Sequence, residues 1–295
     1  MRALKAFSCL ALLLLLVLPW VSNARRRSDT QDREHTLTGT IRTHKNFHSK
    51  FLTGDRDLIV YLPPGYDTDR TKRYPVLYLH DGQNLFDGAT SFIAGKEWRV
   101  DETAQALIAS GKIKPLIIVG VYNTSARIDE YTPTKDANVK QGGRADLYGR
   151  LLVEELKPFI DAQYRTLRGP QETGLGGSSL GGLVSLYLGL KYPQVFGKLA
   201  VVSPSVWWDN RIILRDVQAL TKRPRTRIWL DIGTKEGRDT AEATGGARAL
   251  RDALVAKGWK ENSDLKYFEA DGAEHNETAW AERAGPMLIF LFGKK

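Results

Sequence analysis

The chain has 295 residues, of which 42% are hydrophobic and 26% charged, and its formal net charge is +9. This hydrophobic content suffices for a large buried core and excludes a chain that is disordered throughout. The single cysteine, Cys9, lies in a segment that we expect to be removed, which excludes a disulfide framework and a cysteine-based zinc site. The positive charge favours acidic partners. A basic helix, a zinc-finger spacing and Lys/Arg runs with interleaved aromatics are missing from the sequence, which argues against nucleic-acid binding.

Residues 1–24 have the pattern of a secretory signal peptide. Arg2 and Lys5 form a positive start, an apolar run follows, and Ser22 and Ala24 supply small side chains at the two positions that a signal peptidase reads. The run is shorter than the roughly 20 residues of a membrane-spanning helix, although an uncleaved anchor is the alternative. We therefore expect cleavage after Ala24 and a periplasmic or secreted protein without a stable membrane partner.

The remaining chain predicts a polar segment at residues 25–34 and one domain at residues 35–295. Two segments, 35–43 and 51–62, alternate in polarity as half-exposed strands do, which indicates an antiparallel opening pair. Short apolar runs follow, typical of strands buried on both faces of a sheet. They lie at residues 75–80, 115–122, 173–178, 198–202, 227–232 and 265–270.

Helical periodicity separates these runs, and Asp101 is a plausible cap for the first helix. The predicted helices span residues 101–110, 147–164, 180–191, 212–220, 241–257 and 278–292. Strands that alternate with helices of this length imply right-handed crossovers and a mostly parallel sheet. The sequence thus predicts a three-layer α/β domain with an antiparallel N-terminal strand pair.

Residues 123–144 form a long irregular stretch between predicted elements. Loops longer than about 12–15 residues are uncommon unless they are functional or disordered. Loops that follow the strand ends of a parallel sheet line its ligand crevice. We interpret this stretch as a wall of the substrate site; a surface insertion without a role is the alternative.

Residues 177–181 read Gly-Ser-Ser-Leu-Gly and match the G-x-S-x-G pattern. The motif follows a predicted strand and opens a predicted helix, as a nucleophile elbow requires. The turn presents the hydroxyl of Ser179 at a helix N-terminus, where the helix dipole favours negative charge. Ser179 is therefore the candidate nucleophile. The alternative is a glycine-rich tight turn with an incidental serine.

A serine nucleophile needs a general base, and in this type of hydrolase the chain order is serine, acid, histidine. Of five histidines, only His275 follows Ser179, so His275 is the candidate base. The acid should lie between them in a loop after a strand. Glu236 is the first choice and Asp239 the second, whereas Asp231 lies inside the predicted strand.

Acyl transfer develops negative charge on the carbonyl oxygen, which two backbone N–H groups must face. One is the amide after the nucleophile, that of Leu180. The other should come from the loop after the strand at residues 75–80, where Gln83 is the favoured donor. An ordinary turn is the alternative reading of that loop.

Four segments of the chain resemble the putative esterase family. They are Tyr-Leu-His-Asp-Gly-Gln-Asn-Leu-Phe at residues 78–86, Gly-Gly-Ser-Ser-Leu-Gly-Gly at 176–182, Ser-Pro-Ser-Val-Trp-Trp at 203–208 and Gly-Thr-Lys-Glu at 233–236. That family includes enterochelin-type siderophore esterases, feruloyl and acetyl xylan esterases, S-formylglutathione hydrolase and mycolyltransferases.

The resemblance runs from about residue 58 to residue 292 and implies an α/β-hydrolase fold. It implies Ser179 as nucleophile, His275 as base, and Gln83 and Leu180 in the oxyanion hole. Glu236 falls where many members carry the acid, whereas some siderophore esterases manage without one. The signal segment disfavours S-formylglutathione hydrolase, which works in the cytosol.

Substrate contacts are expected from aromatic and basic residues near strand ends. Trp207 and Trp208 follow a strand and would stack on a sugar or an aromatic acyl group, with core packing as the alternative. Arg127 and Tyr131 lie in the long loop and would meet an acidic or polar substrate.

Together these features predict an exported serine esterase that needs no cofactor and no metal. A siderophore ester and an acylated carbohydrate are the expected substrates. The alternatives are an acyltransferase with a sugar acceptor and a non-catalytic binding protein on the same scaffold.

Overall fold

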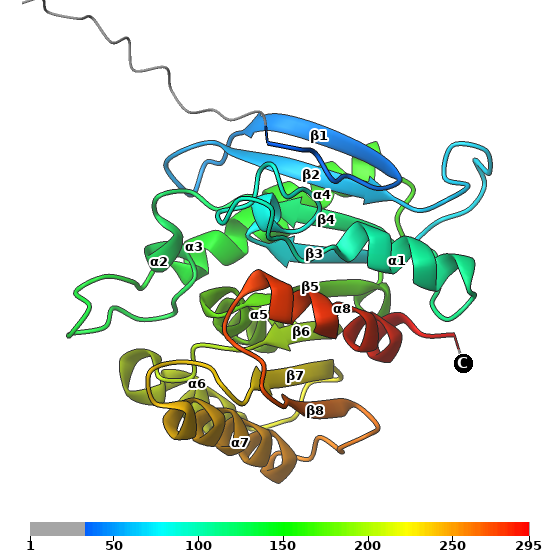
Figure 1. The fold of residues 1–295 in the computed structure, drawn as a ribbon. Coiled ribbons are helices and arrows are strands. Elements are labelled where there is room, and N and C mark those ends of the chain that lie inside the picture. Colours follow the sequence, from blue (N-terminus) through cyan, green and yellow to red (C-terminus); the bar gives the residue numbers. More distant parts are fainter. Residues whose placement is uncertain (1–32, 295) are drawn as a thin grey trace, which may run out of the picture. The chain divides into compact units, whose positions relative to one another are not determined.

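The computed structural model describes residues 33–294, in which eight strands form one sheet with the order β1-β2-β4-β3-β5-β6-β7-β8 (Figure 1). The predicted signal segment and most of the polar segment lie outside the described residues. The strands are β1 (Thr40–Phe47), β2 (Arg56–Leu62), β3 (Val76–His80), β4 (Ile117–Val121), β5 (Thr173–Ser178), β6 (Lys198–Val202), β7 (Arg227–Gly233) and β8 (Leu265–Ala270).

The antiparallel pairing is confined to the N-terminal edge of the sheet. Strand β2 runs antiparallel to β1 and to β4, and every other neighbouring pair is parallel. The predicted mostly parallel sheet with an antiparallel opening pair is therefore confirmed. Strands β5, β6 and β8 have the predicted bounds. Strands β5 and β6 are almost fully buried, as expected for central strands, whereas β8 is a partly exposed edge strand.

Helices cover both faces of this sheet. The helices are α1 (Val100–Ala109), α2 (Arg127–Glu130), α3 (Ala145–Arg150), α4 (Lys157–Gln163), α5 (Leu180–Lys191), α6 (Trp208–Ala219), α7 (Thr240–Ala256) and α8 (Glu277–Phe292). Short 3-10 helices η1 (Gly82–Asn84) and η3 (Pro170–Glu172) and a π-helix η2 (Leu151–Leu156), which joins α3 to α4, complete the set. The helix predicted over residues 147–164 is therefore interrupted by a π-helical segment.

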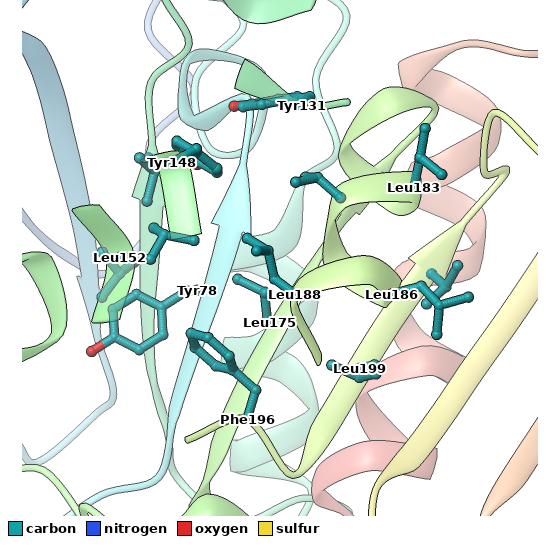
Figure 2. Packing of buried hydrophobic residues seen from close by; sticks show 14 of the residues in the cluster. Tyr78, Tyr131, Tyr148, Leu152, Leu175, Leu183, Leu186, Leu188, Phe196 and Leu199 are labelled. Atoms are coloured by element: carbon teal, nitrogen blue, oxygen red, sulfur yellow. The ribbon is translucent and has the colours of Figure 1, made fainter. Parts of the chain in front are cut away.

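The two faces of the sheet carry separate hydrophobic clusters. Buried side chains of α3 to α7 pack on one face, and those of α1 and α8 pack on the other. Figure 2 shows the first cluster, in which Leu175, Leu188 and Leu199 are completely buried. Phe196 packs against the ring of Tyr78 with the ring centres 6.5 Å apart. Among residues 33–294, none of the helices is long and apolar enough to cross a bilayer.

The predicted cap of the first helix is wrong. Helix α1 begins at Val100 after Arg99, whose φ is 53°, and Asp101 is completely buried inside its first turn. The Asp101 carboxylate accepts the backbone N–H of Thr38 at 2.7 Å instead of capping the helix. Thr38 lies 63 residues away, so a tertiary partner overrides the local capping preference.

His80 ends β3 and is buried. Its side chain is 1% exposed, and Nδ1 lies 2.9 Å from the hydroxyl of Tyr148. Burial lowers the pKa of His80 to about 3, because a charged imidazolium would lose its hydration there. His80 is therefore neutral near pH 7.

This lowered pKa predicts a contribution of His80 to acid unfolding. An unfolded chain binds a proton at His80 below about pH 6.5, whereas the folded chain does so only near pH 3. As the pH is lowered from about 6.5 to about 3, the free energy of unfolding should therefore decrease, by up to about 1.4 kcal/mol per pH unit from this group. Urea unfolding of wild type and His80→Gln at several pH values from 7 to 4 should show a shallower decline for the variant. Parallel declines would contradict this account.

Candidate active site

Ser179 occupies the turn between β5 and α5 in a strained backbone conformation, with φ 59° and ψ −122°. Strain of this kind costs on the order of 1–3 kcal/mol and persists only where neighbours hold it. Here the N–H of Ser179 donates to the carbonyl of Val202 at 3.0 Å, and its carbonyl accepts the N–H of Ser205 at 3.1 Å. A Cβ at Gly182 would lie 2.8 Å from the Val202 carbonyl oxygen, so the turn requires glycine there. The fold thus holds the Ser179 hydroxyl at the start of α5.

The structure brings His275 and Glu236 together from the ends of β8 and β7. His275 Nδ1 lies 2.7 Å from Glu236 Oε2, and the edge of the imidazole meets the ring of Trp280 at 4.9 Å. His275 is 38% exposed, whereas Glu236 is 2% exposed. The second candidate acid, Asp239, instead caps α7 by accepting the N–H of Glu242 at 3.0 Å. Asp239 as the partner of His275 is therefore wrong.

The other oxygen of Glu236 is held by three donors. Oε1 accepts the backbone N–H of Gly233 at 2.7 Å, the hydroxyl of Ser203 at 2.5 Å and Nη2 of Arg283 at 3.3 Å. The Ser203 hydroxyl also accepts from Trp280 and Arg283, at 3.0 and 2.8 Å. Because Oε1 is used in this way, Oε2 is left to accept from His275.

Arg283 lies between two buried carboxylates. Its Nε is 3.2 Å from Asp231 Oδ1, and Asp231, Glu236 and Arg283 are each at most 3% exposed. Burial raises the pKa of Asp231 to about 6, although the charge of Arg283 opposes the rise. Arg283 could not be recognised from the sequence, because a single arginine in an amphipathic helix carries no signal. Ser203 lies in the Ser-Pro-Ser-Val-Trp-Trp segment at residues 203–208, but nothing in that segment indicates a contact with Glu236.

Removal of Arg283 should therefore destabilise the protein strongly. Arg283→Met would leave the carboxylates of Asp231 and Glu236 buried without a counter-charge, at a cost of about 3–5 kcal/mol in the free energy of unfolding. The matched control is Arg248→Met, because Arg248 makes an even closer ion pair with Glu269, both distances 2.7 Å, on the exposed surface. Chemical unfolding should show little change for the control. Equal losses in the two variants would contradict this assignment.

Ser179 and His275 lie where two cavities meet. The larger has a volume of about 650 Å³ and the smaller about 350 Å³, and both are lined by Ser179, His275 and Arg127. An ester held at Ser179 would extend on both sides of its carbonyl. The two cavities therefore suit the acyl and alcohol parts of an ester. The Ser179 hydroxyl lies 3.3 Å from that of Ser205, in the wall of the larger cavity.

The two predicted oxyanion donors flank the candidate nucleophile. Leu180 is the first residue of α5 and lines the larger cavity, whereas Gln83 lies in η1 and lines the smaller one. N–H groups in the first turn of a helix have no acceptor within the helix and are available to an anion. A Cβ at Gly82 would lie 2.6 Å from the backbone of Gly120, so η1 packs directly on β4.

The long loop at residues 123–144 borders both cavities, as a wall of the site would. Arg127 lines both, and its Nε and Nη2 each lie 2.7 Å from the carboxylate of Asp81. Tyr131 is completely buried and lines neither cavity, so its predicted contact with substrate is wrong. Its hydroxyl instead accepts the N–H of Asp81 at 3.4 Å. A sequence pattern cannot reveal which loop side chains turn inward.

Both tryptophans after β6 line the larger cavity. Trp207 is 53% exposed, and its ring centre lies 5.6 Å from that of Trp208. Trp208 is 1% exposed and donates from Nε1 to the carbonyl of Thr134 at 2.9 Å, which ties α6 to the long loop. Trp207 thus keeps an exposed surface for stacking, whereas Trp208 combines core packing with a cavity face. Within residues 33–294, no group of three or more His, Cys, Asp or Glu side chains is arranged to hold a metal ion.

Residues 49–291 match the Putative esterase family. The chain is 28% identical over 239 residues to an endo-1,4-beta-xylanase/feruloyl esterase of Xylanibacter ruminicola. The aligned region covers 79% of this chain and 29% of that protein. It is 29% identical to the ferri-bacillibactin esterase BesA of Bacillus subtilis, over 62% of this chain and 67% of the relative. The enterobactin esterase FES of Shigella flexneri has a similar fold, with a TM-score of 0.68, 19% identity and coverage of 88% and 61% of the two chains.

Proposed function

This chain belongs to the putative esterase family and is a carboxylic ester hydrolase, and we propose that it works through an acyl-enzyme on Ser179. The observation that carries this proposal is the 2.7 Å contact between His275 and the buried Glu236 beside Ser179, in a cavity that all three line. A serine on a strained turn, a histidine and a buried carboxylate are the parts that nucleophilic ester cleavage requires.

In the first half of the reaction, Glu236 accepts a hydrogen bond from the Nδ1–H of His275, which keeps the proton on Nδ1 and leaves Nε2 as the basic nitrogen. Ser179 Oγ attacks the ester carbonyl carbon and passes its proton to His275. The N–H groups of Leu180 and Gln83 stabilise the oxyanion. The tetrahedral intermediate collapses, the bond to the alcohol oxygen breaks, and His275 returns the proton to the leaving alcohol.

In the second half, water attacks the acyl-enzyme. His275 takes a proton from the water, and the same two amides stabilise the second oxyanion. The bond between Ser179 Oγ and the acyl carbon breaks, Ser179 recovers its proton and the acid leaves. Arg283 and Ser203 hold Glu236 throughout, so that the imidazole keeps one orientation.

For the substrate, we propose an ester with an aromatic, negatively charged part. The larger cavity carries the exposed ring of Trp207 together with Arg211 and Arg238, two exposed cations without an ion-pair partner among the described residues. Asp239 and Glu242 line the same cavity, but Asp239 is used to cap α7. An exposed aromatic ring and unpaired cations in one cavity suit an anionic aromatic group, as in a catecholate siderophore. The names of BesA and of other siderophore esterase relatives support this choice. An acylated carbohydrate is the second candidate, because Trp207 would stack on a sugar equally well.

We also propose that the protein is exported. The support is the sequence of residues 1–24, and an N-terminus at Arg25 in protein recovered from outside the cytoplasm would test it.

The nucleophile assignment predicts a large loss of activity in one variant. Ser179→Ala should lower kcat for p-nitrophenyl acetate by several orders of magnitude, because no acyl-enzyme forms. The matched control is Ser178→Ala, which removes the neighbouring hydroxyl at the end of β5 and should retain most of the activity. A fully active Ser179→Ala sample, pure and folded, would exclude the proposed mechanism.

The substrate assignment predicts a charge-dependent change in KM. Arg211→Gln/Arg238→Gln should raise KM about 10-fold or more for ferric enterobactin and leave that for methyl ferulate nearly unchanged, since only the first is strongly anionic. Acetylated xylan with and without a sugar acceptor completes the panel and detects acyl transfer. Two results would exclude the anionic substrate. One is a wild-type kcat/KM that is highest on acetylated xylan, and the other is a change in KM of the double variant that is equal for all esters.

A further inference from the structure

The carboxylate of Asp81 is bound almost entirely by the long loop of residues 123–144. Oδ1 accepts from Arg127 Nε at 2.7 Å and from Asn123 Nδ2 at 2.5 Å, and Oδ2 accepts from Arg127 Nη2 at 2.7 Å. The Asp81 side chain is 10% exposed and that of Arg127 28%. A bidentate arginine–carboxylate pair in a partly buried place is strong and fixes geometry as well as distance.

Asp81 immediately precedes the turn that carries one of the proposed oxyanion donors. Its backbone has φ 56° and ψ 48°, a left-handed conformation that aspartate adopts only where neighbours hold it. The next residue, Gly82, is pressed against the backbone of Gly120. The peptide that bears the N–H of Gln83 therefore has its direction set by Asp81 on one side and by β4 on the other.

The same loop also holds the Gln83 side chain. Its Oε1 accepts the backbone N–H of Asn123 at 3.3 Å, so Asn123 contacts both Asp81 and Gln83. Arg127 stacks over the ring of Tyr131, with its guanidinium carbon 5.1 Å from the ring centre. The Tyr131 hydroxyl accepts the Asp81 N–H. The Asp81 segment is thus held through its carboxylate and through its backbone.

We propose that Arg127, acting through Asp81, is a positioning residue for the oxyanion hole. The pair sets the direction of the Gln83 N–H toward the developing oxyanion, so the long loop takes part in the chemical step as well as forming a wall. This inference rests on the proposed acyl-enzyme mechanism on Ser179. It also gives Arg127 a different role from the direct contact with an acidic substrate that the sequence suggested.

The two roles of Arg127 predict different kinetics. A misdirected oxyanion donor lowers kcat for every ester, because the donor acts on the transition state and hardly on the bound ester. Loss of a direct contact raises KM for anionic esters and leaves neutral esters unchanged. The comparison therefore uses p-nitrophenyl acetate and the anionic p-nitrophenyl hydrogen succinate.

The experiment measures kcat and KM for Arg127→Met, Arg127→Lys, Asp81→Asn and Arg127→Met/Asp81→Asn. We expect kcat to fall about 10²-fold in Arg127→Met for both esters, with KM within about threefold of wild type. Arg127→Lys should retain more activity than Arg127→Met. The kcat of the double variant should be no lower than that of the less active single variant, because the two residues act as a unit. The matched control is Lys140→Met, which removes an exposed charge from the same loop without contacting Asp81.

Unchanged kcat in folded Arg127→Met, or a rise in KM limited to the anionic ester, would overturn the positioning role. Additive losses in the double variant would overturn it as well. If Arg127→Met does not fold, as judged by thermal unfolding, the isosteric Asp81→Asn decides by the same criteria. Ser179→Ala is run in parallel: activity that survives in it refutes the acyl-enzyme proposal itself, whereas activity that depends on Ser179 but not on Arg127 refutes only this inference.

Discussion

The carboxylate of Glu236 is shared between the protein interior and the imidazole of His275. One oxygen is fixed by the Gly233 N–H, the Ser203 hydroxyl and Arg283, and the other lies 2.7 Å from His275 Nδ1. Because this carboxylate is buried and cannot turn, the imidazole has one orientation, with its second nitrogen free for proton transfer. In the proposed mechanism, the strained turn at Ser179 and the two adjoining cavities serve ester cleavage only if that orientation is kept.

The sheet explains why these distant residues meet. In a parallel sheet, the loops after the carboxyl ends of the strands gather at one edge. Ser179 follows β5, Glu236 follows β7, His275 follows β8, and Asp81 follows β3. The site is thus assembled from four strand ends, and the long loop after β4 closes it. Two separate networks support it: Arg283 of α8 contacts Glu236, the proposed acid, and Arg127 of the loop contacts Asp81, which precedes the proposed oxyanion turn.

Much of this arrangement could be predicted from the sequence, because its signals are local. The sequence predicted the bounds of β5, β6 and β8, and chain order alone singled out His275. Two of the errors involve tertiary packing: Asp101 accepts from Thr38 instead of capping α1, and Tyr131 turns into the core. The third is local, because Asp239 caps α7 instead of contacting His275. Arg283 could not be predicted, because its pairing with Asp231 and Glu236 exists only after α8 has packed on β7.

The most direct test of this account is the site of covalent modification, because several serines lie close together at the end of β5 and after β6. Peptide mass spectrometry of protein treated with a fluorophosphonate should locate the adduct on Ser179 alone, and prior removal of the His275 imidazole by His275→Ala should abolish labelling. An adduct on Ser178, Ser203 or Ser205, or labelling that is unaffected by His275→Ala, would contradict the proposed nucleophile and base.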